Sequence, residues 1–218
     1  MAAFDKKADK FINKEYAEQG KTVATRLFPF INEEILKNNE KVNILDMGCG
    51  VGAVTIPLSL LNPKFIIDGI DPSIKMIEYF EKRVKEEKVE RVFPTFQAEP
   101  KPENKYNIAY TTNVLRYIQD ISGFLKQIYD SLVKDGQILI VDYEKSEKTE
   151  IFHTKRDSAL FYPTGFSKEE LQKLLIDANF KDVKVLDFGI IEKRFTDKDN
   201  KVLNIPFDFL VATGFKHD

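Results

Sequence analysis

Short apolar runs alternate with amphipathic segments over most of the chain, and this alternation restricts its fold more than any other feature. Four runs are expected to be strands: Val42–Met47, Lys64–Ile70, Tyr106–Tyr110 and Gln137–Val141. A strand that is apolar along its whole length is buried on both faces, as in a parallel sheet covered by helices on each side. The alternation therefore predicts an α/β fold with a mainly parallel sheet.

Helical periodicity fills the segments between these runs. One apolar stripe extends from Ile74 to Val84, and a second extends from Ile121 to Val133. Asp135-Gly136 is expected to end that second helix and to lead into the next strand. Ser167 and Glu170 have the spacing of a capping box, which predicts the start of a further helix.

The two ends of the chain depart from this pattern. Residues 1–40 read as a helical N-terminal cap, with a kink expected at Pro29. Val183–Phe188 and Phe207–Thr213 are strand-like with no helical pattern between them, which predicts an antiparallel closing hairpin. Residues 143–166 have no clear period and are expected over the carboxyl edge of the sheet.

Length and composition limit the class of protein. At 218 residues, one domain (1–218) is expected, with the cap at 1–40, a core at 41–145 and a site-side segment with the closing hairpin at 146–218. The charge balance of 33 basic against 35 acidic residues gives no overall basic surface, so nucleic acid is an improbable partner. A single cysteine excludes an intramolecular disulfide.

The sequence also predicts where the protein is found. No apolar run approaches the roughly 20 residues that a membrane span needs. The first residues carry acidic side chains and no apolar segment, so neither a signal nor a transit peptide is expected. A cytoplasmic location follows as an expectation, and the oligomeric state stays open.

A glycine-rich turn follows the first predicted strand, at Gly48, Gly50 and Gly52. Glycine lets the backbone bend sharply and lets a ligand approach the main chain. Gly48, Gly50 and Ala53 fit the dinucleotide pattern G-x-G-x-x-G/A, so the glycines do not distinguish NAD from another adenosine ligand. Tight packing alone is the structural alternative.

Two acidic residues help to separate these ligands. Asp71 ends the second predicted strand, 19 residues after Gly52, where a carboxylate can accept both ribose hydroxyls of either ligand. Asp46 stands just before the turn, where it would repel a pyrophosphate but attract the ammonium and sulfonium groups of S-adenosylmethionine. Asp46 therefore favours S-adenosylmethionine. Alternatively, Asp46 could cap local amides, and Asp71 could be a helix N-cap in competition with Ser73.

These motifs, in this order, resemble the class I S-adenosylmethionine-dependent methyltransferases, in particular their small-molecule branch (methyltransferase type 11, UbiE-like). The resemblance spans residues 41–215. It rests on five segments: Leu45–Gly52, Gly69–Met76, Tyr106–Asp120, Leu132–Asp142 and Phe166–Phe180. The chain departs from the family pattern at Gln97, where an acid is often found, and at Arg116, where a histidine is common.

The resemblance implies a Rossmann-like, seven-stranded, mainly parallel sheet with helices on both faces and an antiparallel last strand. It also implies S-adenosyl-L-methionine as cofactor, S-adenosyl-L-homocysteine as product, and no metal. Asp46, Gly48 and Gly50 would face the methionine part, and Asp71 would hold the ribose. The other implied contacts are Pro72 and Met76 near the adenine, Ala98 and Glu99 beside it, and Thr112 and Asn113 at the sulfonium end.

Methyl transfer from a sulfonium is an in-line displacement, for which the protein mainly aligns the reacting atoms in a dry site. A hydroxyl acceptor also needs a base, and the candidates are His153, Asp142 and Tyr143. Tyr16 and Arg26 of the N-terminal cap could close over the site, although they could equally lie on a helix surface.

A small molecule accepting the methyl group on an O or N atom is the favoured substrate, with a protein side chain next. The segment after the fourth-strand run lacks the Asn/Asp-Pro-Pro-aromatic motif of amino-methylating nucleic-acid enzymes. Two other functions stay open. An NAD(P)-dependent oxidoreductase is opposed by Asp46 and by the lack of an obvious Tyr-x-x-x-Lys set. A non-catalytic methyltransferase-like binding module is left open by the departure at Arg116 and by Pro163, which stands where similar small enzymes often have the histidine of a His-x-Gly-Phe motif.

Overall fold

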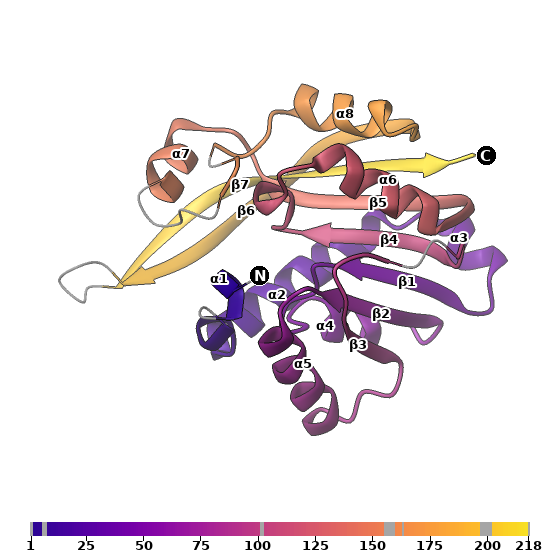
Figure 1. Cartoon of the computed structure of the whole chain (residues 1–218), viewed down its shortest axis with the longest axis horizontal. Coiled ribbons are helices and arrows are strands. Elements are labelled where there is room, and N and C mark those ends of the chain that lie inside the picture. Colours follow the sequence, from indigo (N-terminus) through magenta and orange to yellow (C-terminus); the bar gives the residue numbers. More distant parts are fainter. Residues whose placement is uncertain are drawn as a thin grey trace.

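A seven-stranded sheet forms the centre of the molecule in the computed structural model, which describes residues 2–5, 8–100, 103–154, 160–162, 164–196 and 202–217. Its strand order is β3-β2-β1-β4-β5-β7-β6 (Figure 1). The strands are β1 (Val42–Met47), β2 (Phe65–Asp71), β3 (Val92–Phe96), β4 (Tyr106–Thr112), β5 (Leu132–Tyr143), β6 (Lys181–Thr196) and β7 (Val202–Lys216). Strand β7 runs antiparallel to both β5 and β6, while the pairs among β1 to β5 are parallel, which confirms the predicted fold.

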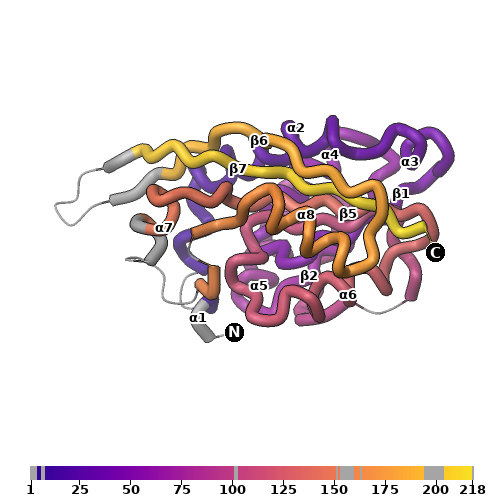
Figure 2. The backbone as a smooth tube through the Cα atoms, turned by 90° about the horizontal axis from the view of Figure 1, so that it is seen from above, coloured from indigo at the N-terminus to yellow at the C-terminus, as the bar shows by residue number. Residues whose placement is uncertain are grey.

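Helices cover both faces of the sheet (Figures 1 and 2). They are α1 (Ala2–Asp5), α2 (Lys14–Leu27), α3 (Glu33–Asn38), α4 (Thr55–Leu61), α5 (Ile74–Glu86), α6 (Ile121–Ser131), α7 (Glu147–Thr154) and α8 (Lys168–Asp177), with short 3-10 turns η1 (Ala8–Phe11), η2 (Phe28–Phe30) and η3 (Leu115–Tyr117). Successive side chains of β1 point to opposite faces of the sheet and pack into different helical layers. Ile44 packs in the layer that contains α2, α3 and α4, and Leu45 packs in the layer that contains α6 and α8.

Several local predictions are confirmed. Ser167 and Glu170 form the capping box at the start of α8. Pro29 lies in the 3-10 turn that separates α2 from α3. The closing hairpin is present and longer than predicted, and β6 and β7 extend as a two-stranded ribbon beyond the rest of the sheet (Figure 2).

Other predictions are corrected by the structure. Helix α6 ends at Ser131, four residues before Asp135, because Leu132 already pairs with Tyr106 of β4. Residues 143–166, predicted without regular structure, contain α7. Strand β3 was not predicted from the pattern of apolar residues.

No helix in the described part of the chain is long and apolar enough to cross a membrane. The cytoplasmic location stays a prediction.

Candidate active site

The predicted site lies where the strand order reverses. Strands β1, β2 and β3 follow one another toward one edge of the sheet, while β4 lies on the other side of β1. Open α/β sheets bind their ligands at such a point, beyond the carboxyl ends of the strands. Asp46 is level with Gly69 of β2 and with Tyr110 of β4, so the residues two positions further on, Asp71 and Thr112, flank the start of the glycine turn.

The glycine turn is packed on two sides and open on one. Its three glycines have φ angles of 81°, 54° and 72°, a backbone region that favours glycine. A Cβ atom at Gly48 would lie 2.5 Å from Cγ2 of Val114, and one at Gly52 would lie 2.1 Å from Cε2 of Phe80. A Cβ at Gly50 would meet nothing within 4 Å. A ligand can therefore approach the main chain at Gly50.

Asp71 ties the end of β2 to this turn. Its Oδ2 accepts a hydrogen bond from the Gly50 amide at 3.0 Å, and its Oδ1 accepts one from the Ser73 amide at 2.9 Å. Burial raises the pKa of Asp71, outweighing these two hydrogen bonds. Ser73, not Asp71, is the N-cap of α5, because its hydroxyl accepts a hydrogen bond from the Met76 amide.

Asp46 is buried beneath the turn, with 2% of its surface exposed. Its Oδ2 accepts hydrogen bonds from the Thr55 hydroxyl at 2.5 Å and the Tyr110 hydroxyl at 2.6 Å. Desolvation outweighs both bonds and raises the pKa of Asp46 to about 7. Side-chain hydroxyls, rather than local amides, thus hold this carboxyl group, which can change its charge near neutral pH.

The β4 side of the turn carries an unsatisfied acceptor. Asn113 follows β4 with a φ of 60°, and its amide donates to the Val141 carbonyl at 2.9 Å. Its Oδ1 is buried and has no hydrogen-bond partner among the described residues. A buried acceptor without a donor is costly, so a bound donor such as an ammonium group would offset that cost. Thr112, one residue earlier, is half-buried.

The other predicted cofactor residues lie around Asp71. Pro72 is half-buried, and Met76 is buried against Val51. Ala98 and Glu99 are exposed in the loop after β3. That loop starts beside Asp71, because the Gln97 amide donates to the Asp71 carbonyl at 3.1 Å.

The N-terminal segment covers the turn from outside. The Ser73 hydroxyl donates to Asp5 at 2.6 Å, and the Tyr79 hydroxyl donates to Asp9. Ala8 is fully buried, in a small cluster that also contains Val51 and Met76. The N-terminal segment thus packs against Val51 of the turn and against the start of α5, while Gly50 stays open.

Of the two cap residues singled out in the sequence, only Tyr16 faces the site. Burial, together with the nearby charges of Asp46 and Asp71, raises the pKa of Tyr16 to about 12. Arg26 instead donates to the Ile190 carbonyl of β6 at 2.7 Å. Tyr16 therefore keeps a neutral hydroxyl, and its ring packs against the cluster of Val51 and Ala53 in the turn.

A buried ion pair lies on the β5 side of the site. Nε of Arg116, in η3, donates to Oδ1 of Asp142 at 2.9 Å, and both side chains are at least 97% buried. The Arg116 guanidinium lies 3.9 Å from the Tyr143 ring centroid. Burial raises the pKa of Asp142 in spite of Arg116, and burial raises the pKa of Tyr143 well above its usual range. Arg116 thus contacts both Asp142 and Tyr143 at the end of β5.

One cation in this region carries no signal in the sequence. Lys193 of β6 is half-buried, and its Nζ donates to Gln19 Oε1 of α2 at 3.2 Å. Burial and the neighbouring Arg116 lower the pKa of Lys193 to about 8. The third proposed base, His153, belongs to α7, but its side chain lies outside the described residues.

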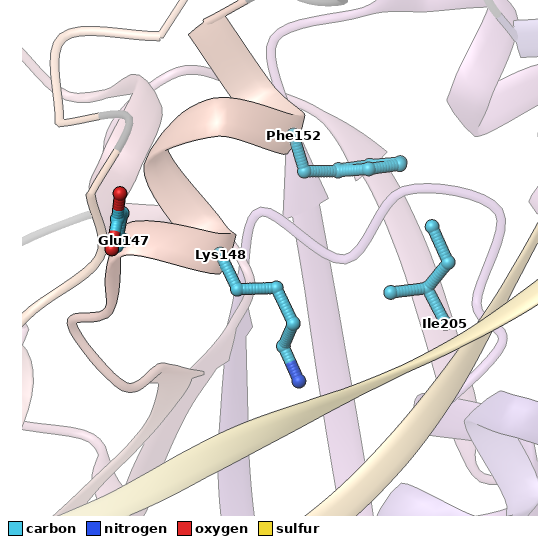
Figure 3. A pocket seen from close by; sticks show the side chains of 4 residues that line it. All are labelled: Glu147, Lys148, Phe152 and Ile205. Atoms are coloured by element: carbon cyan, nitrogen blue, oxygen red, sulfur yellow. The ribbon is translucent and has the colours of Figure 1, made fainter.

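Two open hollows lie away from the glycine turn. One, of about 520 Å³, is lined by Glu147, Lys148 and Phe152 of α7 and Ile205 of β7 (Figure 3). Another, of about 450 Å³, lies at the amino ends of the strands and includes His217. We place the candidate site at the turn, because the strand ends, the carboxylates and the orphaned Asn113 acceptor converge there.

Metal ligands do not gather in the described part of the chain, where no group of three or more His, Cys, Asp or Glu residues could hold an ion. The absence of a metal stays a prediction.

Known proteins resemble the chain in both sequence and fold. Phosphoethanolamine N-methyltransferase 3 of Arabidopsis thaliana is 30% identical over 82% of this chain and 35% of its own length. Malonyl-[acyl-carrier protein] O-methyltransferase of Priestia megaterium is 26% identical over 73% of this chain and 60% of its own length. The chain thus spans about a third to three fifths of these relatives.

Solved structures show the same fold. A SAM-dependent methyltransferase of Thermotoga maritima, described as a possible histamine N-methyltransferase, superposes with a TM-score of 0.64 at 20% identity and covers 98% of each chain. Phosphoethanolamine N-methyltransferase 2 of Haemonchus contortus, bound to S-adenosyl-L-methionine, gives a TM-score of 0.62 at 17% identity and covers 96% of this chain and 60% of its own. A family model described as a methyltransferase domain matches residues 16–185. The chain therefore belongs to the methyltransferase domain family.

Proposed function

We propose that this chain binds S-adenosyl-L-methionine and moves its methyl group to an O or N atom of a small-molecule acceptor. The observation that carries the proposal is the glycine turn, open at Gly50 and flanked by the buried carboxyl groups of Asp46 and Asp71. A diphosphate on the same turn would meet the carboxyl group of Asp46, which disfavours NAD. The relatives named as phosphoethanolamine and malonyl-carrier methyltransferases support a small or carrier-bound acceptor.

The residues around the turn fit the groups of this cofactor. Asp71 uses one lone pair of each oxygen for a backbone amide, so each oxygen can still accept a ribose hydroxyl. Asp46 and the unsatisfied Oδ1 of Asn113 suit an ammonium group. Pro72, Met76, Ala98 and Glu99 would border the adenine, and Gly48 and Thr112 would complete the methionine end.

When bound, the cofactor supplies a methyl group already activated by its sulfonium. The residues of the chain then bind, orient and exclude water. The N-terminal segment, with Asp5 and Asp9 attached to α5, limits access of water to the turn. The Tyr143 hydroxyl, with its raised pKa, stays protonated and can orient an acceptor by a hydrogen bond. His153 and Asp142 stay candidates for holding a proton released by the acceptor.

The decisive experiment is a pair of measurements on the purified chain. Isothermal titration with S-adenosylmethionine, S-adenosylhomocysteine and NADH tests the cofactor, and we expect the first two to bind and NADH not to. Transfer of a labelled methyl group to phosphoethanolamine, to malonyl-carrier protein and to a peptide mixture tests the acceptor. Tight binding of NADH alone would refute the proposal, and cofactor binding without any transfer would favour a non-catalytic module.

A further inference from the structure

Lys193 is a half-buried cation without an acidic partner among the described residues. Its Nζ donates to a neutral amide oxygen, that of Gln19, and otherwise lies 5.9 Å from the Tyr143 ring centroid and 5.6 Å from that of Phe209. Aromatic rings and one amide leave donors of this ammonium group available. A structural lysine in such a position would be expected to pair with a carboxylate.

Arg116, a second cation, lies close to Lys193. Its Nη1 is buried and has no hydrogen-bond partner among the described residues, while its Nε is bound to Asp142. Both cations approach the Tyr143 ring, and Arg116 is close enough to lower the pKa of Lys193. Asp142 balances only one of the two positive charges. Two partly desolvated cations with one acid repel each other, and a bound anion would offset that repulsion.

We propose that Lys193 and Arg116 form an anion subsite that binds a carboxylate or phosphate group of the methyl acceptor. This inference rests on the proposed function only where it names the methyl acceptor as the ligand. The anion subsite itself follows from the positions of Lys193 and Arg116. Lys193 would make the direct contact, since it is the more exposed of the two. Arg116, whose Nε is bound to Asp142, would contribute its unpartnered Nη1 as a second donor beneath it.

The position of the subsite matches this role. The Tyr143 ring lies 3.9 Å from the Arg116 guanidinium and 5.9 Å from Nζ of Lys193, and Tyr16 is near enough to contribute to the raised pKa of Tyr143. Tyr16 in turn packs against Val51 and Ala53 of the glycine turn, and the charges of Asp46 and Asp71 raise its pKa. An acceptor anchored at Lys193 would thus extend past the two tyrosine hydroxyls toward the methionine end of the cofactor.

Binding of small anions tests the subsite without knowledge of the natural acceptor. Inorganic phosphate, malonate and neutral malonamide are titrated calorimetrically into the wild-type chain, alone and with S-adenosylhomocysteine. We expect at least one anion to bind and malonamide not to. Lys193→Met should weaken anion binding roughly 10- to 150-fold, as for loss of one charge-assisted hydrogen bond. Lys193→Arg should keep most of it.

The matched control is Lys184→Met, which removes an exposed lysine from the same strand. It should leave anion binding unchanged, and all three variants should keep the wild-type affinity for S-adenosylhomocysteine. Equal binding of anions by wild type and Lys193→Met, or no anion binding by wild type, would overturn the subsite. Failure to bind S-adenosylhomocysteine, with anion binding intact, would instead refute the proposed function alone.

Transfer assays then separate the two anion classes. Phosphoethanolamine is compared with ethanolamine, and malonyl-carrier protein with its acetyl counterpart. A preference for phosphoethanolamine over ethanolamine identifies phosphate as the bound group, and a preference for the malonyl over the acetyl carrier identifies carboxylate. In Lys193→Met the KM for the preferred substrate should rise and the preference should disappear. No preference in either pair would contradict the subsite's role in acceptor binding.

Discussion

Asp46 should make cofactor binding depend on pH near neutrality. Its pKa of about 7 means that the carboxyl group is only partly ionised in the ligand-free protein at pH 7. A ligand that carries a positive charge prefers the ionised form, so binding at lower pH must first remove a proton. One pH unit corresponds to about 1.4 kcal/mol. The affinity for S-adenosylmethionine should therefore fall about tenfold between pH 8 and pH 6.

Isothermal titration at half-unit steps between pH 6 and pH 8 measures this dependence. Repeating it in buffers with different ionisation enthalpies should show proton release on binding at pH 6. The folding stability of the ligand-free protein depends on pH in the opposite direction. Because the folded state raises the pKa of Asp46 above the usual 3.8, its contribution to stability is present below about pH 4 and is lost as pH rises through about 7.

The control is Asp46→Asn, which keeps an oxygen for the Thr55 and Tyr110 hydroxyls but cannot ionise. Its thermal melting at pH 6 shows whether it folds, and its cofactor affinity should vary little with pH. A wild-type affinity that stays constant from pH 6 to pH 8 would refute the reasoning. The same slope in Asp46→Asn would place the titrating group elsewhere.

Three further predictions concern the glycine turn, the ribose contact and the far end of the sheet. Gly52→Ala should lower the free energy of unfolding by about 1–3 kcal/mol more than Gly50→Ala in denaturant titrations, because only the first Cβ overlaps Phe80. Gly50→Ala should instead weaken cofactor binding. Asp71→Ala should weaken S-adenosylmethionine binding roughly 10- to 150-fold, as measured calorimetrically. His217 bridges two aspartates, which raise its pKa, so it stabilises the fold below about pH 6.5, and this contribution is lost as pH rises through the raised value. The melting-temperature difference between wild type and His217→Gln should accordingly be larger at pH 6 than at pH 8.5.

Each of these predictions can be contradicted separately. Equal unfolding free energies for the two glycine variants would show that Phe80 moves aside at little cost. An unchanged dissociation constant in a folded Asp71→Ala protein would exclude this residue from the ribose site. A pH-independent effect of His217→Gln would show that the imidazole acts without its charge.

Patterns local in sequence were sufficient for much of the fold. The buried run Val42–Met47 and the glycines after it could form only a strand and a tight turn, because hydrophobic period and backbone freedom depend on neighbouring residues alone. The ends of parallel strands meet at one edge, so the proximity of Asp46 and Asp71 also followed from their places in sequence.

The secondary structure of the edge strand β3 and the end of helix α6 depend instead on pairing between strands that are distant in sequence. Strand β3 contains Pro94 and exposes Phe93 and Phe96, so its residues lack the burial pattern of an inner strand, and pairing with β2 alone makes it a strand. Helix α6 stops early because Leu132 gains a strand partner in Tyr106. Short-range periodicity carries no information about such long-range hydrogen bonds.

The charged residues of the site also fall into two groups, those that the sequence predicts and those that only the fold brings to the site. The acids of the turn stand in recognisable motifs, but Lys193 lies on an otherwise ordinary strand and carries no motif at all. Its hydrogen bond to Gln19 joins residues 174 positions apart. Only the folded sheet brings β6, the end of β5 and the N-terminal cap together. Burial among these elements shifts the pKa values of Lys193, Tyr16 and Asp46. No single segment of the sequence determines that burial.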